Sequence, residues 1–125
     1  MPAEKPLVDK LGVKPGQLVA VVGAVDRSLV DQVRERGGVL IDDGEPVDHL
    51  FVEVETPADL ASLPGLVPRM RRNGALWTVR RKGRRDQTEG DVLAAGRAAG
   101  LLDVKVVRLS ETHSLCRWVI PVSRR

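Results

Sequence analysis

Three stretches of the chain follow one pattern: an apolar run, then a Ser or Thr three residues before an Asp, then apolar residues at helical spacing. The apolar runs are residues 18–22, 49–54 and 75–79, and the pairs that follow them are Ser28 with Asp31, Thr56 with Asp59, and Thr88 with Asp91. Such pairs are typical of the capping box that begins a helix, and short aliphatic runs are typical of strands buried on both faces. The pattern predicts an α/β sheet with right-handed crossovers and helices on both faces.

Shorter segments complete the predicted sheet. Residues 39–41 form a brief apolar run, and the runs at 104–109 and 115–122 are separated by the five residues 110–114, which favours an antiparallel hairpin. We expect a Rossmann-like three-layer sandwich of about six strands, with residues 1–12 as an N-terminal arm. Because an ordinary domain has about 100–200 residues, the 125 residues are predicted to form one domain, 1–125.

The charged residues are unevenly distributed, although the net charge is only +3. Residues 69–85 contain eight cations and no acid, whereas residues 42–59 contain seven acids and no Lys or Arg. Five of the cations lie in the predicted loop after the strand at 75–79: Arg80, Arg81, Lys82, Arg84 and Arg85. This basic loop could bind phosphates or nucleic acid by charge, or it could pair with the acidic stretch, within one molecule or across a homodimer. With aromatic residues at 2%, sequence-specific recognition of nucleic acid by stacking is not expected.

The cysteine and histidine content argues against structural cross-links. Cys116 is the single cysteine, which excludes an internal disulfide and favours a reducing compartment. Neither histidine has a second ligand at a spacing typical of zinc sites, so no metal is expected. The first ten residues lack the apolar run of a signal peptide, and no apolar run approaches the roughly 18 residues of a membrane span. We therefore expect a cytoplasmic protein.

One cluster has the residue types of a catalytic set: Glu111, Thr112, His113 and Cys116. A thiol and an imidazole can pair as nucleophile and base. However, His113 and Cys116 are three residues apart at the start of a predicted strand, where alternation directs their side chains to opposite faces. The interpretation we favour is a buried structural Cys116 and a His113 in an exposed turn, so no catalytic residue is predicted.

Segments spread over nearly the whole chain match the sequence pattern of one group of proteins. The matching segments are residues 10–16, 19–23, 74–77, 86–92 and 98–106, with the Glu111-Thr112 pair. They resemble an uncharacterised family of short bacterial proteins, common in actinobacteria, which are degenerate relatives of class I S-adenosylmethionine-dependent methyltransferases. The resemblance implies a truncated methyltransferase sheet with strand order 2-1-3-4-6-5, in which the last strand lies antiparallel between its neighbours. The chain departs from the family at His113, where relatives tend to have Trp, and at residues 80–82.

In doubly wound sheets, ligands bind beyond the carboxyl ends of the strands, next to the first strand. The candidate lining of such a site is Gly23 and Ala24 after the first strand, Asp42 and Asp43 after the second, and Glu55 after the third. Asp42 follows Gly23 by 19 residues, a spacing that suits an acid binding ribose hydroxyls. The turn has a single glycine, however, and residues 43–48 are too few for the strand and helix that wall the adenine in this fold. No cofactor is therefore expected, with S-adenosylmethionine as the alternative.

These observations favour a non-catalytic, methyltransferase-like module that binds a ligand or a protein partner. Two alternatives remain open. One is a vestigial S-adenosylmethionine- or nucleotide-binding protein, or a methyltransferase, that uses Gly23 and Asp42. The other is a charge-driven phosphate or nucleic-acid binder that uses residues 80–85.

Overall fold

A mixed six-stranded sheet lies at the centre of the molecule, in the order β2-β1-β3-β4-β6-β5. The computed structural model describes residues 10–42 and 45–124. The strands are β1 (Leu18–Val22), β2 (Val39–Leu40), β3 (Val47–Glu53), β4 (Met70–Arg81), β5 (Leu102–Arg108) and β6 (His113–Val119). Strands β1 to β4 pair in parallel, whereas β6 is antiparallel to both β4 and β5. The predicted α/β fold class is confirmed, and so is the strand order that the family resemblance implies.

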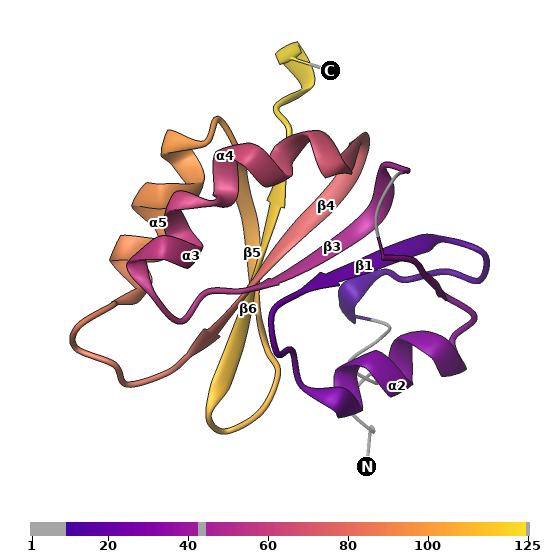
Figure 1. Cartoon of the computed structure of the whole chain (residues 1–125), viewed down its shortest axis with the longest axis horizontal. Coiled ribbons are helices and arrows are strands. Elements are labelled where there is room, and N and C mark those ends of the chain that lie inside the picture. The colour runs from indigo at the N-terminus through magenta and orange to yellow at the C-terminus, as the bar shows by residue number, and fades with distance from the viewer. Residues whose placement is uncertain (1–9, 43–44, 125) are drawn as a thin grey trace.

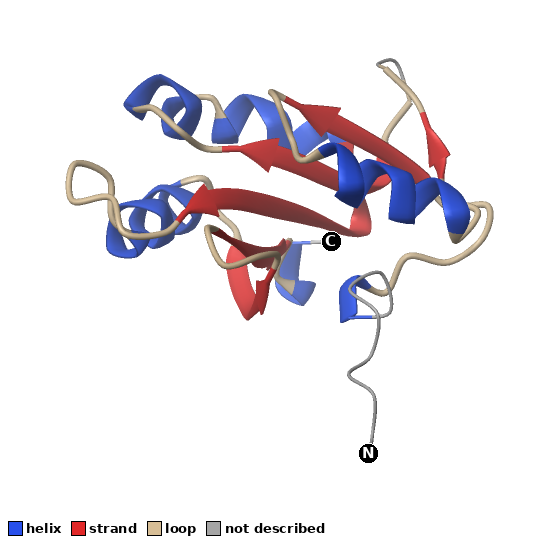
Figure 2. Cartoon of the chain, turned by 90° about the horizontal axis from the view of Figure 1, so that it is seen from below, coloured by secondary structure: helices blue, strands red, loops and turns tan. Residues whose placement is uncertain are grey.

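Helices cover both faces of this sheet (Figure 1 and Figure 2). They are α2 (Arg27–Glu35), α3 (Pro57–Ala61), α4 (Leu63–Leu66) and α5 (Glu89–Ala98), with 3-10 turns η1 (Val67–Arg69) and η2 (Val122–Arg124). Leu29 and Val33 of α2 pack with Phe51 and Trp77 in the core on one face. Leu63 of α4 and Val92 of α5 pack with Leu50, Leu76 and Trp118 in the core on the other. The aliphatic runs are continuous because β1, β3 and β4 are buried on both faces.

Two of the three predicted helix caps are confirmed. Thr56 and Thr88 each accept a hydrogen bond from the backbone N–H of the Asp three residues on, and each Asp accepts one in return. The prediction for the first helix is wrong: Asp26 is its N-cap and accepts from the Ser28 N–H at 2.7 Å. Asp caps helices as well as Ser does, so the helix begins at the earlier cap.

The ends of β4 and β6 differ from the prediction because pairing between these two strands extends both of them. β4 extends to Arg81 because Arg80 and Arg81 pair with Ser114 and His113 of β6. The predicted basic loop is therefore shorter, since its first two cations lie in a strand. His113 likewise begins β6 and does not lie in the turn. Among the helices of the described residues, none is long and apolar enough to cross a bilayer.

Candidate functional site at the carboxyl edge of the sheet

The turn after β1 is closed by a side chain from the end of β3. Gly23 has φ +89°, and a Cβ added there would lie 2.9 Å from Cβ of Glu53. The backbone N–H of Ala24 lies close enough to the Glu53 carboxyl to lower its pKa. A glycine in this conformation lets the two segments approach closely, so Glu53 occupies the space beside the turn.

Glu53 lies in a negative environment. Burial raises the pKa of its carboxyl, and the nearby charges of Glu55 and Asp59 raise it further. The Ala24 N–H and the charge of His113 act in the opposite direction. These acids converge because all three lie at the end of β3 or in the segment that follows it. Sequence reasoning missed Glu53 because nothing in its local sequence indicates that it faces Gly23.

Asp42, the acid expected to bind a ribose, follows the short strand β2. β2 pairs only with the start of β1, so that Leu40 is level with Val19. Gly23 lies four residues beyond Val19 and Asp42 two beyond Leu40, an offset of two residues, or about 7 Å at the rise of a strand. Beyond β2, the Asp42 carbonyl accepts from Nη2 of Arg69, just before β4, at 2.6 Å. Asp42 is thus tied to the region where β4 begins, and Asp43 lies outside the described residues.

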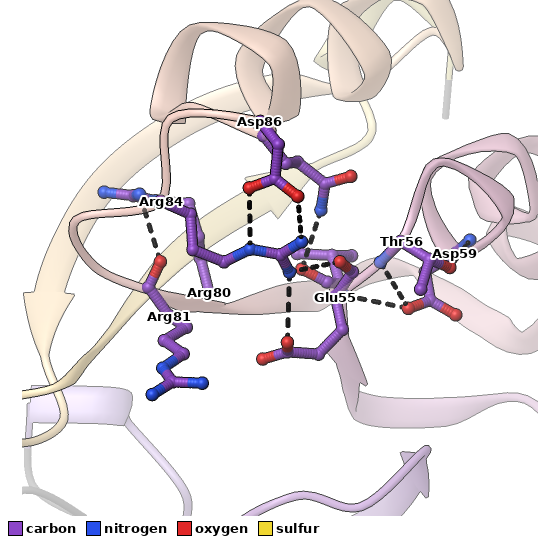
Figure 3. Close-up of polar contacts among 9 residues, drawn as sticks. Glu55, Thr56, Asp59, Arg80, Arg81, Arg84 and Asp86 are labelled. Carbon is purple, nitrogen blue, oxygen red and sulfur yellow. Dashed lines mark hydrogen bonds and ion pairs between the residues drawn. The ribbon is translucent and has the colours of Figure 1, made fainter.

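Arg84 joins the loop after β4 to the end of β3 (Figure 3). Its Nη1 donates to the carbonyl and to Oε2 of Glu55, the latter at 3.0 Å. Its Nε and Nη2 donate to the two carboxylate oxygens of Asp86, at 3.1 and 2.7 Å. The hydrogen bond between them raises the pKa of Arg84 and lowers that of Asp86. This guanidinium is therefore engaged within the chain.

The segment at the end of β3 is held from two further directions. The buried Gln87 side chain donates from Nε2 to the carbonyl of Val54 at 2.9 Å. Oδ2 of Asp59 accepts from the backbone N–H groups of Glu55 and Thr56, at 2.8 and 3.0 Å. Figure 3 shows Asp59 and Arg84 on either side of Glu55. Hydrogen bonds from three directions therefore hold the backbone at the carboxyl end of β3 in place.

The remaining cations of the predicted basic loop are used in different ways. Lys82 donates from Nζ to the carbonyl of Ser110 at 3.2 Å. Arg80 donates from Nη1 to the carbonyl of Arg81 at 3.3 Å. Arg81 and Arg85 are exposed. The loop therefore presents fewer available cations than its sequence indicates.

Contacts between the basic and acidic stretches form within one molecule. Besides Arg84 with Glu55, Arg71 pairs with Asp48 at 3.2 Å, and Arg69 contacts the Asp42 carbonyl. The two stretches meet because residues 42–59 include β3 and residues 69–85 include its parallel neighbour β4.

The hairpin cluster does not assemble a catalytic pair. Oγ of Ser110 accepts from the backbone N–H groups of Thr112 and His113, and Nδ1 of His113 lies 2.8 Å from the Thr112 hydroxyl. Glu111 is exposed. Cys116 is buried in the core beneath α5, whereas His113 alternates to the opposite face with Leu115. Burial raises the pKa of the Cys116 thiol to about 11, which disfavours the nucleophilic thiolate.

A buried histidine at the other edge of the sheet was also not predicted as a site residue. Nδ1 of His49 accepts from the Trp77 indole N–H at 3.2 Å, and its Nε2 lies 3.0 Å from Oε1 of Gln17. Burial, and then the charge of Arg117, lower the pKa of His49 to about 4, although Asp48 opposes the shift. Within residues 10–42 and 45–124, no group of three His, Cys, Asp or Glu side chains could hold a metal ion.

The chain is similar in structure to methyltransferases. It matches a SAM-dependent methyltransferase from Aquifex aeolicus with TM-score 0.69 and 15% identity, over 90% of this chain and 86% of that one. It also matches the 1,6-didemethyltoxoflavin-N1-methyltransferase of Burkholderia thailandensis, with TM-score 0.64, 17% identity and coverage of 90% and 75%. Fibrillarin from Aeropyrum pernix, solved with S-adenosyl-L-methionine, matches with TM-score 0.56, 18% identity and coverage of 86% and 68%. No family model and no curated protein matches. At these identities the likeness defines the fold, which is that of a class I methyltransferase.

Proposed function

We propose that this chain is a methyltransferase-like binding module that does not transfer methyl groups. The observation that carries the proposal is the Glu53 carboxylate on the Gly23 turn, where this fold ordinarily receives its ligand. The module would act through its surfaces on a protein partner. The ion pairs of Arg71 with Asp48 and of Arg84 with Glu55 favour charge pairing within one molecule over pairing across a homodimer.

The residues at the carboxyl edge do not fit S-adenosylmethionine as they lie. A donor site needs free backbone amides in the turn after β1 and an acid beside them for the ribose. The Glu53 carboxyl lies at the Ala24 amide, and Asp42 is offset from the Gly23 turn along the register of β1 and β2. In addition, the chain passes from β2 to β3 without a further strand and helix. Each of these features supports a module over an enzyme.

A vestigial donor- or nucleotide-binding protein is the second candidate. It is favoured by the positive φ of Gly23 directly after β1, and by the raised pKa of Glu53, since perturbed acids cluster at functional sites. In this alternative Glu53 would leave the Ala24 amide and bind the ligand in place of Asp42.

Titration calorimetry separates the two candidates. S-adenosylmethionine and S-adenosylhomocysteine are titrated to about 1 mM, which corresponds to roughly 4 kcal/mol of binding free energy. Saturable heat is expected neither for the natural chain nor for Glu53→Gln. Saturable heat that is lost in Glu53→Gln and retained in the matched control Glu45→Gln, an exposed acid away from the turn, would establish the second candidate.

A charge-driven phosphate or nucleic-acid binder is the third candidate, and it now depends on Arg81 and Arg85. Both are exposed, but Arg84 and Lys82 make contacts within the chain. Binding of mixed RNA that weakens steeply with salt, and whose salt slope falls in an Arg81→Gln, Arg85→Gln double variant, would favour this candidate over the first.

A further inference from the structure

A polar cavity of about 190 Å³ lies at the amino edge of the sheet, at the opposite edge from Glu53 and Arg84. It is lined by side chains from the segment before β1, the starts of β3 and β4, and the second half of β6, among them Lys14, Gln17, Asp48, His49, Asn73 and Arg117. Lys14 and Asn73 are exposed, so the cavity opens to solvent on their side. With about 30 Å³ per water molecule, its volume is that of roughly six waters.

A chain of hydrogen bonds determines which groups the cavity offers as donors. The Trp77 indole is a donor only, so Nδ1 of His49 accepts from it and Nε2 carries the proton. Nε2 then donates to Oε1 of Gln17, which also accepts from the backbone N–H of Lys14 at 2.9 Å. With two donors on its oxygen, Gln17 has its amide NH₂ left to donate.

The cavity also contains a cation, Arg117. The Arg117 guanidinium lies over the Trp77 ring, 5.8 Å from its centroid. Its Nε is buried and has no hydrogen-bond partner, and in the described part of the chain no carboxylate pairs with it. A buried guanidinium donor left unpaired is costly, because burial removes its hydration.

The single acid of the lining does not neutralise this cation. Oδ2 of Asp48 accepts from the backbone N–H of Leu18 at 2.8 Å, and Oδ1 pairs with Arg71 at 3.2 Å. His49 stays neutral near pH 7 because of its lowered pKa. Arg117 and Lys14 therefore leave the cavity positively charged, with the Gln17 amide beside them.

We propose that this cavity binds a small oxyanion, that is, the carboxylate or phosphate group of a small molecule. The guanidinium fork matches two oxygens of either group, and Lys14 and Gln17 would supply further donors. The cavity is smaller than the roughly 300–1,000 Å³ of ordinary ligand pockets, so the ligand has few heavy atoms and is not a nucleotide. This site is separate from the carboxyl edge and does not depend on the function proposed above.

The two tryptophans provide a test with an internal control. The Trp77 indole N–H belongs to the cavity network, whereas the Trp118 indole N–H donates to Thr78 at 3.1 Å within the sheet. Inorganic phosphate and succinate are each titrated at constant ionic strength against sodium chloride, while the two indole signals are followed in a ¹H–¹⁵N NMR spectrum. We expect a saturable shift of the Trp77 signal with at least one anion and no matching shift of the Trp118 signal. The anion whose titration saturates the Trp77 shift at the lower concentration identifies the preferred group, phosphate or carboxylate.

Three variants connect the shift to the cavity. Arg117→Gln is expected to raise the apparent Kd at least tenfold, and Lys14→Gln, at an exposed position, to raise it severalfold. Arg27→Gln, at an exposed cation at the start of α2, should leave it unchanged. No saturable Trp77 shift with either anion, or equal affinities in the natural chain and Lys14→Gln, would overturn the proposal.

Discussion

Gly96 of α5 is expected to tolerate no side chain. A Cβ added at this position would lie 2.3, 2.5 and 2.6 Å from three ring carbons of Trp118, whereas carbon atoms in good contact are about 3.5–4.0 Å apart. Trp118 is fully buried, and its indole N–H donates to Thr78. The ring cannot tilt away from the helix without losing that hydrogen bond, so α5 itself would have to move.

Two opposing effects determine the size of the change in Gly96→Ala. Replacing a helical glycine by alanine ordinarily stabilises a helix by up to about 1 kcal/mol. Overpacking a well-filled core costs about 1–3 kcal/mol and occasionally more. The shortest of the distances to Trp118 is 2.3 Å, which is more than 1 Å below the about 3.5 Å of a good contact. We therefore expect an overpacking cost in the upper part of the range of about 1–3 kcal/mol. The net loss in free energy of unfolding is then about 2 kcal/mol.

Urea unfolding monitored by tryptophan fluorescence measures this loss. For a chain of this length, about 2 kcal/mol corresponds to a decrease in Tm of roughly 6–10 °C. Gly90→Ala is the matched control in the same helix, because its Cβ would meet Thr88 at an ordinary 3.5 Å; it should be neutral or stabilising. The reasoning is refuted if Gly96→Ala is as stable as Gly90→Ala.

Two further predictions concern buried titratable groups. The pKa of His49 is lowered to about 4, so between about pH 6.5 and pH 4 the imidazole is protonated in the unfolded state and neutral in the folded state. The free energy of unfolding therefore falls as the pH falls through that range. From pH 7 to pH 5 the loss is about 2 kcal/mol. Urea unfolding at the two pH values should show this loss, and His49→Gln should remove most of it; an unchanged pH dependence in that variant would contradict the assignment. The pKa of the Cys116 thiol is raised to about 11, so at pH 8 the folded chain should react with a thiol reagent roughly a hundredfold more slowly than the urea-unfolded chain, because only the thiolate reacts. Equal rates in the two states would show that the thiol is accessible.

The sequence by itself determined the features that depend on neighbouring residues. The boxes of Thr56 with Asp59 and Thr88 with Asp91 join groups three residues apart, and the aliphatic runs identify buried strands wherever they pair. The short connection from β2 to β3 also follows from counting residues. Together these local signals were sufficient for the fold class. They were insufficient for strand ends such as Arg81, because an end depends on the partner strand.

The tertiary structure alone decided the contents of the two edges. Arg84 meets Glu55 across 29 residues, and Trp77 meets His49 across 28. Whether such pairs meet depends on the register of parallel strands, and a shift of one residue would turn each side chain to the other face. The loop cations and the acidic stretch were evident in the sequence, but the sheet determined that Arg84 is engaged and that Arg117 has no anionic partner among residues 10–42 and 45–124. The physical reason is that charge and burial act through space, whereas sequence patterns report only neighbours along the chain.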